Sequence, residues 1–156
     1  PGPYEWFEIQ DNIAYYKEFE KPKIVYAEIS TEGKFAYDNA SNYSDTTTYI
    51  IADYSEYLLG ILNSKLFTFM FSHISSEIRG GFLRWKRQYM NMLPIASATD
   101  KEKSTITSLV RRILSSSDST YMPALEADID HLIYGLYKLT PEEITLVENS
   151  QRKQPT

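Results

Sequence analysis

The chain has 156 residues, with 16 Lys and Arg against 21 Asp and Glu, and so a formal net charge of −5 at pH 7. This length can bury a real core in one domain, and contents of 42% hydrophobic and 24% charged residues are ordinary for a globular protein. With no cysteine, disulfides and thiolate metal sites are excluded. No run of about 18 apolar residues predicts a membrane span, because Asn63, Ser64 and Lys65 interrupt the best candidate. The start at Pro1, without a methionine or a signal-peptide pattern, is typical of a piece of a larger protein.

Strand signals come first along the chain. Residues 23–30, KIVYAEIS, are rich in β-branched residues and alternate between two faces, which predicts a strand. Residues 31–34 contain a glycine and predict a turn into a second strand at 35–37. The polar run 38–48 has almost nothing to bury and predicts a loop, followed by a strand at 49–52.

A helix is predicted next, because apolar side chains recur at spacing four after the possible N-caps Asp53 and Ser55. The repeated positions are Leu58, Leu62, Leu66, Met70 and Ile74. After the glycine pair at 80 and 81 the pattern becomes extended, and Pro94 closes this segment.

The last third predicts helices. An amphipathic helix spans 100–114, a serine-rich break covers 115–119, and a further helix runs from about 123 to 137. Thr140, Pro141 and Glu143 form an N-cap, a first-turn proline and a capping box for a short final helix. Strands first and helices last predict an α+β fold, with a small mixed β-sheet, packed helices and C-terminal helices.

Catalytic motifs are absent from the sequence, which has no glycine-rich phosphate loop, no GxSxG and no HExxH. Glu126 and Asp130 share a face in the first half of a helix, where the helix dipole favours negative charge, so both are predicted to be solvated. The string Glu32, Gly33, Lys34 is of the ExK type found in metal-dependent nucleases, but its glycine places it in a turn. No catalytic residue and no metal ligand is therefore predicted.

A cationic segment stands out against the acidic background, because four cations and no acid lie within nine residues: Arg79, Arg84, Lys86 and Arg87. Such residues commonly protect an exposed strand edge from pairing. Here, however, aromatic residues alternate with the charges, as in nucleic-acid binding surfaces: Phe82, Trp85 and Tyr89. A localised positive surface on a negative chain implies a local contact with a polyanion.

Roles in DNA binding follow from side-chain chemistry. Arg79 and Arg87 are predicted to contact phosphates, while Gly80 and Gly81 permit close approach of the backbone. If 82–89 is extended, one face carries three side chains that suit base edges: Arg84, Lys86 and Gln88. The polar loop adds weaker candidates, since asparagine in a loop is more often a turn former: Asn39, Asn42 and Tyr43. An alternative is a protein-interaction module, in which two C-terminal helices and an apolar cluster dock a partner subunit: Met90, Met92, Leu93 and Ile95.

A family resemblance is carried by the order of short motifs. The helix LLGILNSKL, followed by RGGFLRWKRQYMNMLPI, resembles the C-terminal specificity domain of Taq-type adenine-N6 DNA methyltransferases and of fused type IIG restriction-modification enzymes. The earlier KPKIVYAEIS and the polar loop fit that family's order, and ALEADIDHLIYGLYKLTPEEITLVE is similar to the closing helix of the fused enzymes. The resemblance covers residues 21 to 148.

The resemblance implies a target recognition domain at 1–98, a helical region at 99–148 that packs on it or acts as a spacer, and a disordered tail at 149–156. A related module forms half of a type I specificity subunit. The implied partners are double-stranded DNA and a methyltransferase domain of the same polypeptide, with or without a nuclease domain. Catalysis and S-adenosylmethionine would belong to that upstream part, so no cofactor is expected in this chain. A cytoplasmic, prokaryotic location is also implied.

Overall fold

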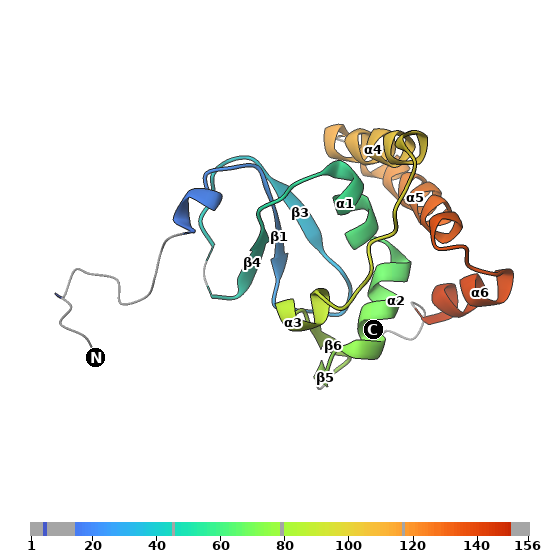
Figure 1. The fold of residues 1–156 in the computed structure, drawn as a ribbon, viewed down its shortest axis with the longest axis horizontal. Coiled ribbons are helices and arrows are strands. Elements are labelled where there is room, and N and C mark those ends of the chain that lie inside the picture. Colours follow the sequence, from blue (N-terminus) through green and yellow to red (C-terminus); the bar gives the residue numbers. More distant parts are fainter. Residues whose placement is uncertain (1–4, 6–14, 45, 79, 117, 151–156) are drawn as a thin grey trace.

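The computed structural model describes residues 5, 15–44, 46–78, 80–116 and 118–150 (Figure 1). Its strands are β1 Lys23–Ala27, β2 Ile29–Ser30, β3 Phe35–Asp38, β4 Thr48–Ile51, β5 Glu77–Ile78 and β6 Phe82–Arg84. Its α-helices are α1 Glu56–Leu62, α2 Lys65–Ile74, α3 Arg87–Met90, α4 Asp100–Ser115, α5 Met122–Leu136 and α6 Pro141–Ser150. Two 3-10 turns complete the elements, η1 Tyr16–Glu18 and η2 Ser119–Tyr121. The predicted α+β fold class is confirmed.

The strands form two antiparallel sheets of three strands, ordered β3-β1-β4 and β2-β6-β5, in place of the expected single mixed sheet. The continuous strand predicted at 23–30 breaks at Glu28, so that β1 and β2 lie in different sheets. At this break the Glu28 N–H donates to the carbonyl of Thr47 (2.9 Å), and its carbonyl accepts from the N–H of Trp85 (2.7 Å). Glu28 therefore connects the polar loop to the end of β6.

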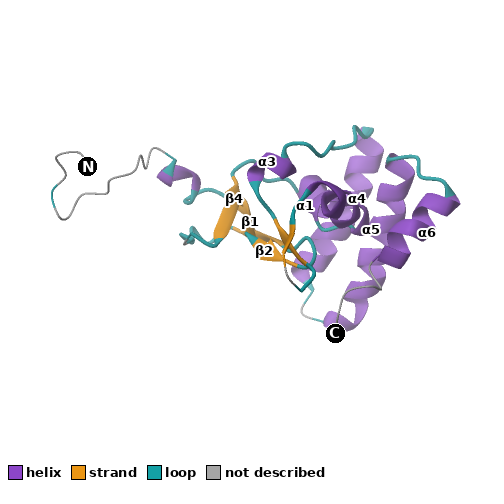
Figure 2. Ribbon diagram, turned by 90° about the horizontal axis from the view of Figure 1, so that it is seen from below, coloured by secondary structure: helices purple, strands orange, loops and turns teal. Residues whose placement is uncertain are grey.

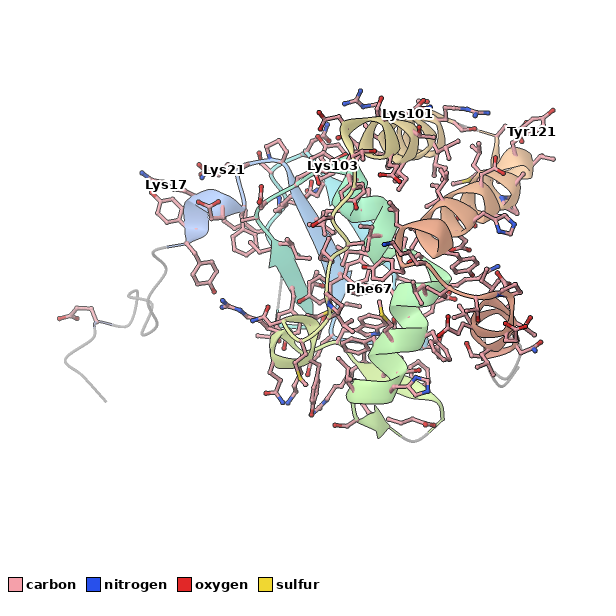
Figure 3. All side chains as sticks on the ribbon, turned by 45° about the vertical axis from the view of Figure 1, so that its right-hand side comes forward. Lys17, Lys21, Phe67, Lys101, Lys103 and Tyr121 are labelled. Carbon is pink, nitrogen blue, oxygen red and sulfur yellow. The ribbon has the colours of Figure 1, made fainter. Side chains whose placement is uncertain are left out.

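The core lies between the first sheet and the helices. Neighbouring residues on β1 and β3 present one face, which contributes three buried side chains: Ile24, Tyr26 and Phe35. Phe67 on α2 is almost fully buried and meets the Phe35 ring edge-on, with centroids 6.1 Å apart. Figure 3 shows Phe67 at the centre of the molecule, where α2 faces the sheet. The strand alternation read from the sequence thus supplies the sheet side of this core, whereas Phe67 lies outside the predicted helix stripe.

The single helix predicted after Ser55 is wrong in one respect, because it divides into α1 and α2 at Asn63 and Ser64. The Ser64 hydroxyl donates to the Ile61 carbonyl (2.7 Å) and accepts from the Phe67 N–H (3.2 Å), so it caps α2. The Asn63 amide pairs with the outer edge of β3, accepting from the N–H of Phe35 (3.0 Å) and donating to its carbonyl (2.9 Å). Side chains of this type compete with helix hydrogen bonds, which explains the break.

The C-terminal helices pack back on the first part of the chain, and Figure 2 shows α1, α4, α5 and α6 gathered on one side of the strands. The helices predicted at 100–114 and 123–137 are confirmed. So is the capping box of α6, where the Glu143 N–H donates to the Thr140 hydroxyl (3.3 Å) and the Thr140 N–H donates to the Glu143 carboxylate (2.8 Å). Among the described residues, no helix combines the length and apolar content that a membrane span requires.

The prediction of a solvated acidic face on α5 is wrong at Asp130, because this residue is buried while Glu126 is exposed. Its carboxylate accepts from the backbone N–H of Lys65 (2.9 Å) at the start of α2. The Lys65 ammonium donates to the Glu148 carboxylate of α6 (2.9 Å), which also accepts from the Tyr134 hydroxyl (2.8 Å). Burial raises the pKa of Asp130, although the hydrogen bond and positive charge of Lys65 oppose the shift. Periodicity placed Asp130 on a helix face correctly but could not show that α2 covers it.

Candidate nucleic-acid interface

The cationic segment begins as a β-hairpin. Strands β5 and β6 pair in register from Glu77↔Leu83 to Ile78↔Phe82. The turn between them contains Gly80 and Gly81, with φ of +90° and +78°. These angles lie in the left-handed region that glycine adopts without strain, so the glycine pair forms this turn. Gly80 is exposed at its tip, and the predicted phosphate contact at Arg79 lies outside the described residues.

Trp85 anchors the hairpin to the core. Its ring is 1% exposed and stacks on Phe71 with centroids 3.9 Å apart. The indole N–H donates to the carbonyl of Ser30 (3.2 Å). Leu83 is buried with it, whereas Phe82 and Arg84 face solvent. The predicted alternation therefore holds through Trp85, and this residue belongs to the core and does not offer a stacking platform.

Beyond Trp85 the prediction of an extended strand to residue 89 is wrong, because Arg87–Met90 form the single helical turn α3. The carbonyl of Lys86 accepts from the N–H groups of Tyr89 (3.0 Å) and Met90 (3.1 Å). Both side chains are half-buried against the core, which favours helical spacing over strand alternation here. Gln88 is exposed on this turn and does not share a strand face with Arg84 and Lys86 as predicted. Arg87 is also exposed, and Lys86 is half-buried.

A groove of about 780 Å³ connects this segment to the polar loop. One wall comes from α3 and the residues after it, and includes Arg87 and Asn91. The other comes from β4 and the loop before it, and includes Ser44 and Thr46. Burial and the neighbouring Tyr49 raise the pKa of Tyr26 in the groove to about 12, while the positive charge of Arg87 acts in the opposite direction. The polar loop and the cationic segment, which are far apart in the sequence, thus line the same groove.

The three loop candidates do not line this groove. Asn39 is exposed, whereas the Asn42 amide donates to the Asp38 carboxylate (3.1 Å). Tyr43 stacks on Phe19, with centroids 5.1 Å apart, and is exposed on its other side. Asn42 and Tyr43 therefore have internal contacts that shape the loop.

A buried ion pair fixes the start of this loop. Lys23 is fully buried, and its ammonium lies 2.7 Å from the carboxylate of Asp38 and donates to the carbonyl of Phe19 (2.6 Å). The other Asp38 oxygen accepts from the N–H of Ala40 (2.8 Å). The hydrogen bond from Lys23 holds the pKa of Asp38 below its usual value, although burial acts to raise it. Sequence reasoning missed this pair, for which the only signal was a lysine at the start of one predicted strand and an aspartate directly after the next.

The cations of α4 lie away from the hairpin. Lys101 and Lys103 belong to α4, at the opposite end of the molecule from β5 and β6 (Figures 1 and 3). Lys103 lies 6.0 Å above the ring of Tyr57, and Arg111 of the same helix is 2.8 Å from the carboxylate of Glu56. In the ExK string, the Lys34 ammonium lies 3.4 Å from the Glu32 carboxylate, so these two residues form an exposed ion pair with each other. The hairpin and groove are thus separate from the cations of α4.

The α+β fold and a cationic hairpin set beside a groove that contains Arg87 define a binding domain. The model of the TaqI-like C-terminal specificity domain family matches residues 4–95, and the chain belongs to this family. The matched range contains both sheets, the hairpin and the groove, and ends at Ile95, before α4. A specificity domain of this kind has a non-catalytic role in restriction-modification enzymes and suggests recognition of a DNA target.

Proposed function

We propose that this chain is a sequence-specific recognition domain for double-stranded DNA and serves an adenine-N6 DNA methyltransferase, with or without a fused nuclease. Methyl transfer, and any S-adenosylmethionine, would belong to other parts of the polypeptide. The observation that carries the proposal is the hairpin itself, in which the buried Trp85 anchors a strand with the exposed Arg84, between a glycine turn and a groove that Arg87 lines. A fixed surface of this kind suits a duplex, because sequence readout needs donors at set positions.

The candidate residues divide into two expected roles. Arg84, on the strand, is the best candidate for a base edge in the major groove, because a guanidinium can donate twice to guanine. Arg87 and Lys86 are expected on phosphates, together with Arg79, and the exposed Gln88 remains a candidate for adenine. The groove adds three side chains that can form hydrogen bonds with DNA: Ser44, Thr46 and Asn91. These three residues were not predicted from the sequence.

The test is a selection of preferred sites from randomised duplexes, performed on the intact gene product. In the double variant Arg84→Ala/Lys86→Ala, the loss of Arg84 should remove the preference at one position of the site, costing roughly 1 to 3 kcal/mol there. The loss of the Lys86 charge should weaken binding to all duplexes equally. The matched control, Lys101→Ala/Lys103→Ala, removes the same number of charges from α4 and should leave the preferred site unchanged. An unchanged site and affinity in the hairpin variant would overturn the assignment.

A second candidate, a surface for a partner protein, is favoured by two exposed apolar side chains after α3. Met92 is 65% exposed and Ile95 is 44% exposed. Replacing both with serine would separate the candidates. A partner surface would lose association with a co-purifying subunit while duplex binding stayed unchanged, whereas the reverse result would assign the two residues to the DNA surface.

A further inference from the structure

We propose that Glu28 positions Arg84, and that Arg84 so held reads a guanine in the DNA target. This inference deepens the proposed function and rests on it. The Glu28 carboxylate lies 3.5 Å from Nε of Arg84, across the pairing of β2 with β6. Glu28 is mostly buried while Arg84 is nearly half exposed. The pair thus has a sheltered acid and a solvent-facing guanidinium.

The backbone of Glu28 is fixed on both sides. Its N–H donates to Thr47, at the end of the polar loop, and its carbonyl accepts from Trp85, the residue after Arg84. Trp85 is itself buried in the core. Both partners of the pair therefore start from backbone positions that are held in place. A carboxylate at a fixed position can hold a long side chain in one orientation.

The contact leaves the useful donors free. A guanidinium has five N–H groups in a fixed fork, and Glu28 lies closest to the one on Nε. The two terminal nitrogens can then donate to O6 and N7 of guanine, the commonest specific contact of arginine. The nearby carboxylate also offsets the positive charge, which lowers attraction to phosphate but leaves the donor geometry intact. Arg84 is therefore better suited to a base than to the DNA backbone.

Neighbouring cations lack this arrangement. Within the part of the chain that the structure describes, neither Lys86 nor Arg87 has a carboxylate within ion-pair distance. Their full charge suits phosphate contacts. Arg84 is thus the oriented arginine of this segment, while Lys86 and Arg87 contribute mainly positive charge.

The experiment uses the intact gene product and the site that the wild type selects. Changing one particular G·C pair to A·T should weaken wild-type binding by about five- to 150-fold, the range for one bidentate contact. Arg84→Ala should remove this discrimination at that position alone. Glu28→Gln and Glu28→Ala should reduce it there, by about three- to tenfold for the amide, which cannot accept from the guanidinium as strongly as a carboxylate.

Affinity for unrelated duplex DNA distinguishes a positioning role of Glu28 from a purely structural one. Because Glu28→Gln removes a negative charge beside the DNA, non-specific binding should stay equal or rise while discrimination falls. A folding defect would lower both, and thermal unfolding of each variant monitors this. Glu32→Gln is the matched control, since Glu32 pairs with Lys34 and not with Arg84, and it should leave discrimination unchanged.

Two results would overturn the inference, and they differ in what else they affect. If Arg84→Ala abolishes the preference for guanine while both Glu28 variants retain it, Glu28 has no positioning role and the proposed function stands. If Arg84→Ala leaves every position of the site unchanged, Arg84 reads no base, and its assignment in the proposed function fails as well.

Discussion

At the scale of single residues, Lys23 and Asp38 form a buried ion pair that the sequence hardly signals. Strand periodicity places Lys23 correctly at the start of β1 but cannot show that its ammonium is buried against β3. The partner lies 15 positions later, and only the antiparallel register brings the two opposite each other. The candidate cations were easier to find, because local charge density needs no tertiary information.

We expect Lys23→Met to destabilise the domain by about 3 to 5 kcal/mol, because it leaves the Asp38 carboxylate buried without its partner. Urea unfolding of the variant and the wild type measures the difference. Lys34→Met is the control, since it removes an exposed pair with Glu32 and should cost less than about 1 kcal/mol. A loss below 1 kcal/mol for Lys23→Met would show that the buried pair does not stabilise the fold.

The same pair predicts a pH dependence. The pKa of Asp38 is lower in the folded state than its ordinary value, so the folded protein binds fewer protons at this group than the unfolded chain. Its contribution to stability is therefore present above the unfolded pKa of about 3.9 and is lost as the pH falls through the folded value. Unfolding free energies between about pH 5 and pH 2 should fall more steeply for wild type than for Asp38→Asn. Parallel curves would contradict this.

At the scale of elements, the sequence predicted where strands and helices occur better than where they stop. The stripe from Leu58 to Ile74 is real, yet it spans two helices because Asn63 and Ser64 make hydrogen bonds that interrupt it. Glu28 divides a β-branched run between two sheets, and the run after Trp85 turns helical because Tyr89 packs inward. Each break depends on a partner distant in sequence, which periodicity cannot show.

The Asn63 amide should matter chiefly for the edge of β3. Asn63→Ala removes both contacts with the Phe35 backbone and should cost about 1 to 3 kcal/mol, because a partly buried N–H and C=O lose their partner. Asn63→Asp keeps an acceptor for the N–H but sets a carboxylate against the carbonyls of Phe35 and Leu59, so it should also destabilise. Urea unfolding, with amide hydrogen exchange at Phe35, measures both. Wild-type protection of that amide in Asn63→Ala would contradict the role.

At the scale of the whole molecule, surface charge matters more in its distribution than in its sum. The net charge of −5 opposes general attraction to DNA, so binding must depend on a local surface. Charge density indicated the hairpin from the sequence, but the groove could not be predicted, because its walls come from segments some 40 residues apart that only the fold brings together. Arg87 lies where these segments meet.

Salt dependence tests whether this local surface contacts phosphates. Each phosphate neutralised by a cation releases counterions, so Arg87→Gln should make the slope of log K against log salt shallower by about 0.9, equally for specific and unrelated duplexes. Lys101→Gln removes the same charge from α4, at the other end of the molecule, and should leave the slope unchanged (Figure 3). Titrations of labelled duplex over about 50 to 200 mM salt supply the slopes. If both variants shifted the slope equally, long-range charge and not a phosphate contact at the hairpin would govern binding.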